Sequence, residues 1–176
     1  MPNLRMSHEI TTESFTEKND LVLDSVVLAA AALKRDARHK EASKILSAIG
    51  LGKVGKCLIT DFIIAEALTL VRFSRRGGAE LSNKMYECLL SSPHLQLVRL
   101  TDAELKTAGE IFKKYPRLSF VDSTTVALML VRGIRDLISF DSDFDGVPGI
   151  ERHEKFEEPE GGRHVLKRQN PAISSY

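Results

Sequence analysis

The chain has 176 residues, of which 43% are hydrophobic and 28% are charged, and its net charge is +1. These values are ordinary for a folded domain and give no overall attraction toward nucleic acid or a membrane surface, so any basic patch must be local. The longest uncharged apolar run, 26–33, is far shorter than the ~20 residues of a membrane-spanning helix, and the polar start is unlike a signal peptide. Two cysteines, Cys57 and Cys88, lie among apolar residues and are predicted to be buried thiols. Free thiols suit a reducing compartment, and we therefore expect a cytoplasmic protein.

Short apolar strands alternate with helices along most of the chain. This alternation predicts a parallel sheet with helices on both faces, in which ligand sites lie beyond the carboxyl ends of the strands. The capping-box pattern Thr101-Asp-Ala-Glu104 marks one helix start, and Thr60 or Asp61 is expected to cap another. The predicted strands are 21–23, 54–59, 95–98, 137–140 and an edge strand at 150–153, and the predicted helices are 25–36, 37–49, 62–73, 79–90, 102–115 and one that starts at 122.

The two ends of the chain differ from its middle in composition. Residues 1–18 are polar with little periodicity, and we predict a flexible N-terminal extension. Residues 157–176 carry clustered charges with Gly and Pro, and we predict a flexible charged C-terminal tail. The folded domain is therefore expected to span 19–156.

Four acidic residues are expected to reach the same rim of the sheet. Asp24 ends the first strand, Asp141 ends the strand 137–140, and Asp122 starts the helix that leads into that strand. Glu66 lies one to two turns into the helix after the second strand. Carboxylates that are packed together repel unless a cation compensates, and an all-oxygen set without His or Cys favours Mg²⁺ or Mn²⁺ over zinc. Such an ion can activate a water for hydrolysis of a phosphodiester.

Each acid also has a simpler interpretation. Asp24 and Asp122 could be helix N-caps, and Glu66 could be a solvated charge on a helix face. The run from Asp141 to Asp145 could be a turn held by side-chain hydrogen bonds. These alternatives remain open for each residue alone, but they weaken jointly because the strand pattern brings several acids to one rim.

Other kinds of site fit the sequence poorly. The segment 141–146 resembles the start of a calcium-binding EF-hand loop, but Arg152 stands where the twelfth position requires a Glu. A phosphatase of the Asp-x-Asp type would need a second Asp where Val26 stands. The glycines of 50–56 are not followed by the Lys-Ser/Thr ending of a Walker phosphate loop.

Four segments carry a family resemblance: Leu21-Val-Leu-Asp24-Ser25, Ile63-Ile-Ala-Glu66, Leu118-Ser-Phe-Val-Asp122 and Ile138-Ser-Phe-Asp141-Ser-Asp143-Phe144. With these segments in order over residues 20–153, the chain resembles PIN-domain proteins, and more closely the VapC-type toxins. The resemblance implies a three-layer α/β/α sandwich with a short central parallel sheet, often paired as a homodimer. It also implies an endoribonuclease that depends on Mg²⁺ or Mn²⁺ and that has RNA as its substrate and an antitoxin protein as its partner.

The resemblance also assigns the site residues. It implies that Asp24, Glu66, Asp122 and Asp141 are catalytic and bind the metal ion, with Asp143 as a further metal ligand. Ser25 and Ser139 stand where they could hydrogen-bond an acid or a phosphate. An RNA-processing or quality-control nuclease and a non-catalytic binding or assembly module of the same fold remain as alternatives. The basic residues that could hold an RNA backbone are Lys34, Arg35, Arg38, Arg72, Arg75 and Arg76.

Overall fold

A central sheet runs through the protein, and its inner strands are parallel. The computed structural model describes residues 20–157 and 165–168, so the predicted extension 1–18 and most of the predicted tail 157–176 lie outside the described residues. The strand order is β3-β2-β1-β4-β5-β6, with parallel pairing from β3 to β5 and antiparallel pairing of β6 with β5. The strands are β1 (Leu21–Leu23), β2 (Cys57–Thr60), β3 (Leu95–Val98), β4 (Asp136–Ile138), β5 (Glu151–Glu157) and β6 (Val165–Arg168).

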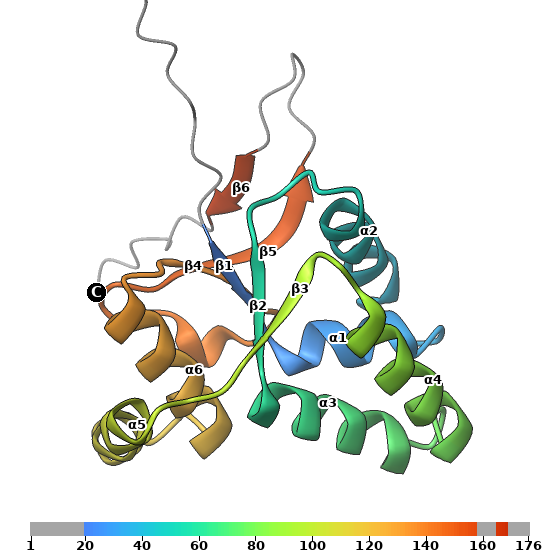
Figure 1. Cartoon of the computed structure of the whole chain (residues 1–176). Helices are drawn as coiled ribbons and strands as arrows, with labels where there is room; N and C mark the ends of the chain where they lie inside the picture. Colours follow the sequence, from blue (N-terminus) through green and yellow to red (C-terminus); the bar gives the residue numbers. More distant parts are fainter. Residues whose placement is uncertain (1–19, 158–164, 169–176) are drawn as a thin grey trace, which may run out of the picture.

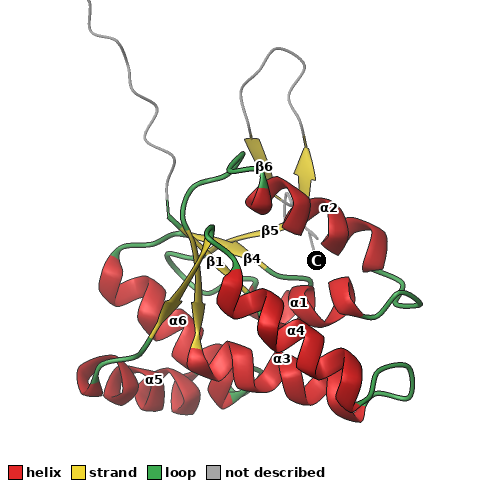
Figure 2. Ribbon diagram, turned by 45° about the vertical axis from the view of Figure 1, so that its right-hand side comes forward, coloured by secondary structure: helices red, strands yellow, loops and turns green. Residues whose placement is uncertain are grey.

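Six α-helices in the described part of the chain cover this sheet and confirm the predicted α/β/α architecture. In Figure 1, α5 and α6 lie to the left of the strands and α1, α2 and α4 lie to the right, and Figure 2 shows the arrangement from a second direction. Helix α5 packs on α6, and α1 packs on both α2 and α3. The helices are α1 (Ser25–Ala32), α2 (His39–Gly50), α3 (Asp61–Phe73), α4 (Ala79–Ser91), α5 (Asp102–Lys114) and α6 (Phe120–Arg132), followed by a 3₁₀ turn at Ser142–Phe144.

Three strands of the sheet differ from the prediction. The last parallel strand, β5, is longer than the predicted 150–153, and it is not an edge strand because β6 pairs with it. Strand β6 lies inside the stretch that was predicted to be a tail, since four residues are too few to give a recognisable alternation. Strand β2 begins at Cys57 instead of residue 54, because the chain still turns through Gly55.

Local capping explains where the helices start. The Thr60 hydroxyl accepts a hydrogen bond from the Ile63 N–H and caps α3, and Thr101 forms the predicted capping box with Glu104. Helix α6 begins at Phe120 instead of Asp122, because Ser119 is its N-cap. Asp122 is therefore the third residue of the helix.

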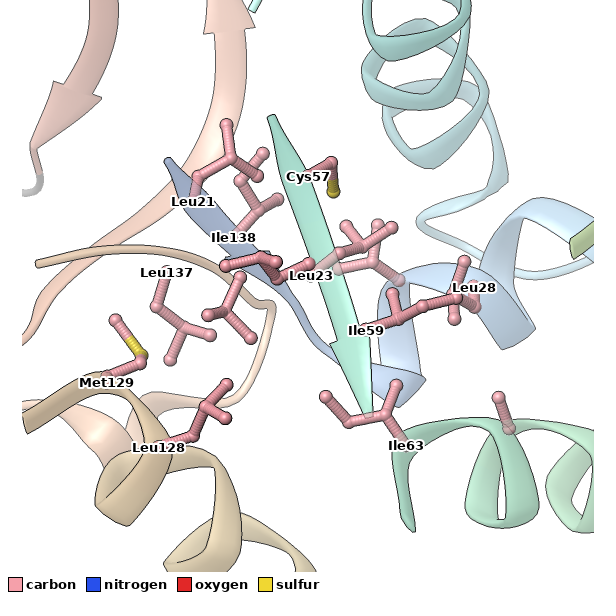
Figure 3. Close-up of a cluster of buried hydrophobic side chains, with 14 of the residues drawn as sticks. Leu21, Leu23, Leu28, Cys57, Ile59, Ile63, Leu128, Met129, Leu137 and Ile138 are labelled. Carbon is pink, nitrogen blue, oxygen red and sulfur yellow. The ribbon is translucent and has the colours of Figure 1, made fainter. Parts of the chain in front are cut away.

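The core is built from the strands and from the helix faces that lie against them. Figure 3 shows Leu21 and Leu23 of β1 beside strand β2, which carries Ile59, with Leu128 and Met129 of α6 on one side. All five side chains are at most 1% exposed. Both faces of the inner strands are thus covered, which explains their continuous apolar sequences.

The cysteine prediction is half right. Cys57 is buried in β2, whereas Cys88 is exposed on α4, because its apolar sequence neighbours point elsewhere around the helix. Among the described residues, the structure contains no helix that is both long and apolar enough to cross a membrane.

Sheet topology fixes where a site can form. From β1 the chain moves outward to β2 and β3, and then returns to place β4 on the other side of β1. The order of connections therefore reverses between β1 and β4. The crevice beyond the carboxyl ends of two such strands is the usual ligand site of an open α/β sheet.

An ion pair between a buried carboxylate and a partly exposed arginine joins α5 to α6. The Glu104 side chain is 2% exposed, and the Arg132 Nε donates to its Oε1 at 2.6 Å. The hydrogen bonds from Arg132 are the largest of the effects that lower the pKa of Glu104 to about 2. The ionised Glu104 therefore stabilises the fold at neutral pH, and this stabilisation is lost as the pH falls from about 4.5 through about 2.

We predict that Arg132→Met lowers the free energy of unfolding by about 3 kcal/mol at pH 7, because it leaves the Glu104 carboxylate buried without its cation. Urea unfolding followed by circular dichroism measures this loss. The matched control is Lys84→Met, which breaks the exposed Glu80–Lys84 pair of α4 and should change the free energy by less than about 0.5 kcal/mol. Equal losses in the two variants would contradict the assigned role of Arg132.

Candidate functional site

Asp24 lies at the reversal point of the sheet. Leu23 is paired with Ile138 in the ladder, so Asp24 and Ser139 are the next residues along β1 and β4. The Ser139 Oγ donates to Asp24 Oδ2 at 2.5 Å, and the Ser25 N–H donates to Asp24 Oδ1 at 2.6 Å. Asp24 is only 2% exposed, so its carboxylate is buried at the end of the sheet.

Two further carboxylates lie near Asp24. Glu66, on α3, accepts a hydrogen bond from the Ser25 Oγ at 2.5 Å, and Ser25 follows Asp24 directly. Asp122, on α6, accepts from the Ser119 N–H at 2.8 Å as part of a capping box. Both carboxylates act electrostatically on Asp24. The structure thus brings together three acids that are 42 and 56 positions apart along the chain.

This environment makes the ionised form of Asp24 unfavourable. Burial is the largest effect and, with the nearby charges of Asp122 and Glu66, it raises the pKa of Asp24 from 3.8 to about 7. Hydrogen bonds from Ser139 and Ser25 act in the opposite direction but do not compensate. A positive charge bound beside Asp24 would reverse the effect, because it favours the ionised carboxylate.

Asp141 is connected to this group through Ser139. The Ser139 Oγ, which donates to Asp24, also accepts from the Asp141 N–H at 2.9 Å. The Asp141 carboxylate caps the 3₁₀ turn by accepting from the Asp143 N–H, also at 2.9 Å. Asp141 therefore makes the turn hydrogen bond that the simpler interpretation expects, next to the acid group.

Asp143 is engaged elsewhere. Its carboxylate is paired with Arg117, whose Nη2 lies 2.5 Å from Asp143 Oδ1. Asp145, in the same loop, is bound by Arg152. The arginine at the twelfth position of the EF-hand-like segment thus supplies the cation that balances this loop.

The donor chemistry of the site fits a hard divalent cation. Asp24, Glu66 and Asp122 offer only oxygen atoms, and the charges of Asp122 and Glu66 add to the effect of burial in raising the pKa of Asp24. In the region covered by 20–157 and 165–168, however, no three His, Cys, Asp or Glu side chains are already grouped so that they could hold an ion. The carboxylates instead accept hydrogen bonds from serines and from the backbone.

Basic residues come together where the loop after α1 meets the loop after α3. The Arg76 guanidinium donates to the Arg35 carbonyl at 2.6 Å, which ties the end of α3 to the loop after α1. Arg75 and Arg76 line a hollow of about 310 Å³ there. The Arg38 guanidinium lies 5.2 Å from the centre of the ring of Phe140, the residue that precedes Asp141 in the chain.

Sequence reasoning missed the importance of Arg152. It considered this residue only as a mismatch to an EF-hand, although the side chain is 3% exposed and contacts Ser139, Asp145 and Glu154. Buried arginines are rare, but an isolated Arg in a strand gives no signal of burial in a single sequence. Arg117, the partner of Asp143, was missed because the two residues are 26 positions apart.

Comparison with known proteins agrees with this geometry. Residues 21–150 match the family model described as PIN domain, and no curated protein sequence matches the chain. Among solved structures, the Mycobacterium tuberculosis toxin VapC20, which cleaves the sarcin-ricin loop, is 25% identical with a TM-score of 0.64. That match covers 73% of this chain and 95% of VapC20.

Two more distant structures share the fold. VapBC2 from Rickettsia felis, bound to a DNA fragment from its promoter, has 14% identity and a TM-score of 0.57, with coverage of 76% of this chain and 97% of the other. A toxin–antitoxin complex from Klebsiella pneumoniae has 17% identity and a TM-score of 0.55, with coverage of 74% and 94%.

The raised pKa of Asp24 predicts a specific pH dependence of stability. The folded state binds the Asp24 proton more tightly than the unfolded chain does, so the free energy of unfolding should fall as the pH rises from about 4 through about 7. In metal-free protein, Asp24→Asn should remove this decrease and be more stable than the unchanged chain at pH 8, by up to about 4 kcal/mol. Urea unfolding of both proteins at about pH 5 and pH 8 measures the difference, and parallel pH profiles would contradict it.

Proposed function

Because the chain belongs to the PIN-domain family, we propose that it is a divalent-metal-dependent endoribonuclease and the toxin of a VapBC-type toxin–antitoxin pair. One observation supports the proposal: Glu66 and Asp122, from distant segments, are close enough to Asp24 to help raise its pKa, at the point where the strand order reverses. The likeness to VapC20, a toxin that cleaves an RNA loop, supports the same reaction class.

In the proposed mechanism Asp24, Glu66 and Asp122 hold Mg²⁺ or Mn²⁺, with Asp141 as a fourth acid and Asp143 as an auxiliary one. When bound, the ion supplies positive charge that stabilises the phosphate as negative charge develops during cleavage. The carboxylate oxygen atoms of Glu66 and Asp122 that do not contact the ion would help to orient the attacking water. Asp143 would have to leave Arg117 before it could contribute.

Two serines orient the acids. The Ser139 hydroxyl fixes one oxygen of Asp24, and the Ser25 hydroxyl fixes one oxygen of Glu66. Hydrogen-bond partners of this kind hold a carboxylate in one rotamer, so that its remaining lone pairs face a ligand. We assign Ser25 and Ser139 to positioning and not to proton transfer.

The arginines of the loops after α1 and α3 are suited to bind the RNA backbone. Arg35, Arg38, Arg75 and Arg76 belong to loops that the Arg76–Arg35 hydrogen bond joins, and they are placed to contact phosphates. Contacts of this kind are independent of sequence, so they would position the RNA without selecting a target.

The surface of α3 and α4 is suited to a protein partner. Large apolar side chains are exposed on these two packed helices, with Phe73 at 79% and Leu90 at 51%. Exposed apolar groups on adjacent elements are typical of interaction sites. We propose that an antitoxin covers this surface and that the toxin works in the cytoplasm as a homodimer. The structures from Rickettsia felis and Klebsiella pneumoniae, which are a VapBC protein and a toxin–antitoxin complex, support the antitoxin.

We predict that purified protein cleaves structured RNA with Mg²⁺ or Mn²⁺ and that EDTA abolishes the cleavage. Asp24→Asn should lower the rate by at least about 100-fold, because it removes the central charge of the acid group. The matched control is Asp102→Asn, an exposed acid in the first turn of α5, which should retain the full rate. Cleavage that persists both in EDTA and in Asp24→Asn would defeat the proposed mechanism.

Expression in a bacterial host separates a toxin from a processing nuclease. We predict that expression of the chain arrests growth, that Glu66→Gln restores growth because it removes one acid, and that coexpression of the adjacent antitoxin gene does the same. Growth curves with equal protein levels on immunoblots measure the effect. If cells that express the unmutated chain grow normally although the purified chain cleaves RNA, the result would favour the processing role.

A further inference from the structure

Arg152 is a buried cation behind the acid group. It lies in β5, its side chain is 3% exposed, and its guanidinium makes four hydrogen bonds. Nε and Nη2 donate to the two carboxylate oxygens of Asp145 at 2.7 and 2.9 Å, and Nη1 donates to Glu154 at 2.7 Å and to the Ser139 carbonyl at 3.1 Å. A side chain so enclosed cannot reach a phosphate of the substrate.

Ser139 is held entirely by its neighbours. Its N–H donates to the His153 carbonyl, its own carbonyl accepts from Arg152, and its hydroxyl donates to Asp24 while accepting from the Asp141 N–H. Two adjacent residues of β5 thus fix the main chain of Ser139, and Ser139 fixes two of the acids. The path from Arg152 to Asp24 contains a single intervening residue.

Arg152 also clamps the acidic loop after β4. The fork of its guanidinium binds Asp145 through two parallel hydrogen bonds, a geometry that specifies both position and orientation. Asp145 ends the 3₁₀ turn that Asp141 caps, and its N–H donates to the Ser142 carbonyl. The loop 141–145 is therefore tied to β5 at one end and to Ser139 at the other.

Arg152 remains positively charged although it is buried. Hydrogen bonds to Asp145 are the largest of the effects that raise the pKa of Arg152, and they outweigh its burial. The guanidinium itself repels a metal ion, and Asp145 and Glu154 offset its charge. Its influence on the acids must therefore act through the geometry that it imposes.

We propose that Arg152 is a positioning residue that holds Asp24 and Asp141 in a cation-binding arrangement by fixing Ser139 and Asp145. This proposal rests on the proposed function for the identity of the site. The positioning role goes beyond the proposed function, because a residue that touches neither RNA nor the ion would then determine the arrangement of the acids.

Arg152→Lys and Arg152→Met test the proposal in the full chain. Lys keeps the positive charge without the fork, and Met keeps the length of the side chain without either. We expect Mn²⁺ affinity, measured by calorimetry, to fall by about tenfold or more in Arg152→Met and by less in Arg152→Lys, as is typical for residues that orient metal ligands.

In RNA cleavage, kcat of the Arg152 variants should fall while KM stays the same. The matched control is Arg135→Met, which breaks the exposed Arg135–Glu151 pair between β4 and β5 and should leave all these values unchanged.

A second readout does not depend on the metal or on activity. In ¹⁵N-labelled metal-free protein, the amide resonances of Asp24, Ser139 and Asp141 should shift in Arg152→Lys and stay unchanged in Arg135→Met. Unchanged resonances and unchanged Mn²⁺ affinity in folded Arg152→Lys would overturn the proposal, even if thermal unfolding showed a lower Tm. If the unchanged chain binds no Mn²⁺, the proposed function fails and the amide shifts still decide whether Arg152 positions the acids. If Arg152→Met does not fold, Arg152→Lys carries both measurements.

Discussion

Repulsion between carboxylates, with one of them buried, is the constraint on which the site depends. Asp24 is drawn below the surface by its place at the end of β1, and Asp122 and Glu66 are close enough to oppose its ionisation. A fold that served only stability would gain nothing from this arrangement, since burying a charge without a cation is unfavourable. The fold tolerates it because Ser25 and Ser139 supply hydrogen bonds, and because the apolar strands behind Asp24 supply the burial energy.

Sheet topology determines where the acids lie, and hydrogen bonds determine how they are oriented. The reversal between β1 and β4 brings Asp24 and Ser139 side by side, and the helices that follow β2 and precede β4 deliver Glu66 and Asp122. Hydrogen bonds then set the direction of each acid within the rim. Strand β5 adds a further layer, since His153 and Arg152 fix the chain from which Ser139 reaches Asp24. The acids at the rim thus depend on residues that lie behind them.

Much of this was predictable from the sequence because it depends on short-range patterns. The apolar triplet before Asp24 predicts a buried strand, and the Thr101–Glu104 box predicts the start of α5. The start of α6 was misplaced because the box around Ser119 uses an Asp where Glu or Gln is usual. Strand β6 and the burial of Arg152 were not predicted, because both depend on pairings that bring distant segments into contact. The strand pattern predicts which residues reach the rim but not which hydrogen bonds hold them there.

Anomalous diffraction from crystals grown with Mn²⁺ is the most direct test of the account. We predict one or more strong peaks within coordination distance of Asp24, Glu66 and Asp122 in the unchanged chain, and no peak there in Asp24→Asn. A manganese ion bound instead by Asp143 and Asp145, or the absence of any peak beside Asp24 at saturating Mn²⁺, would contradict it.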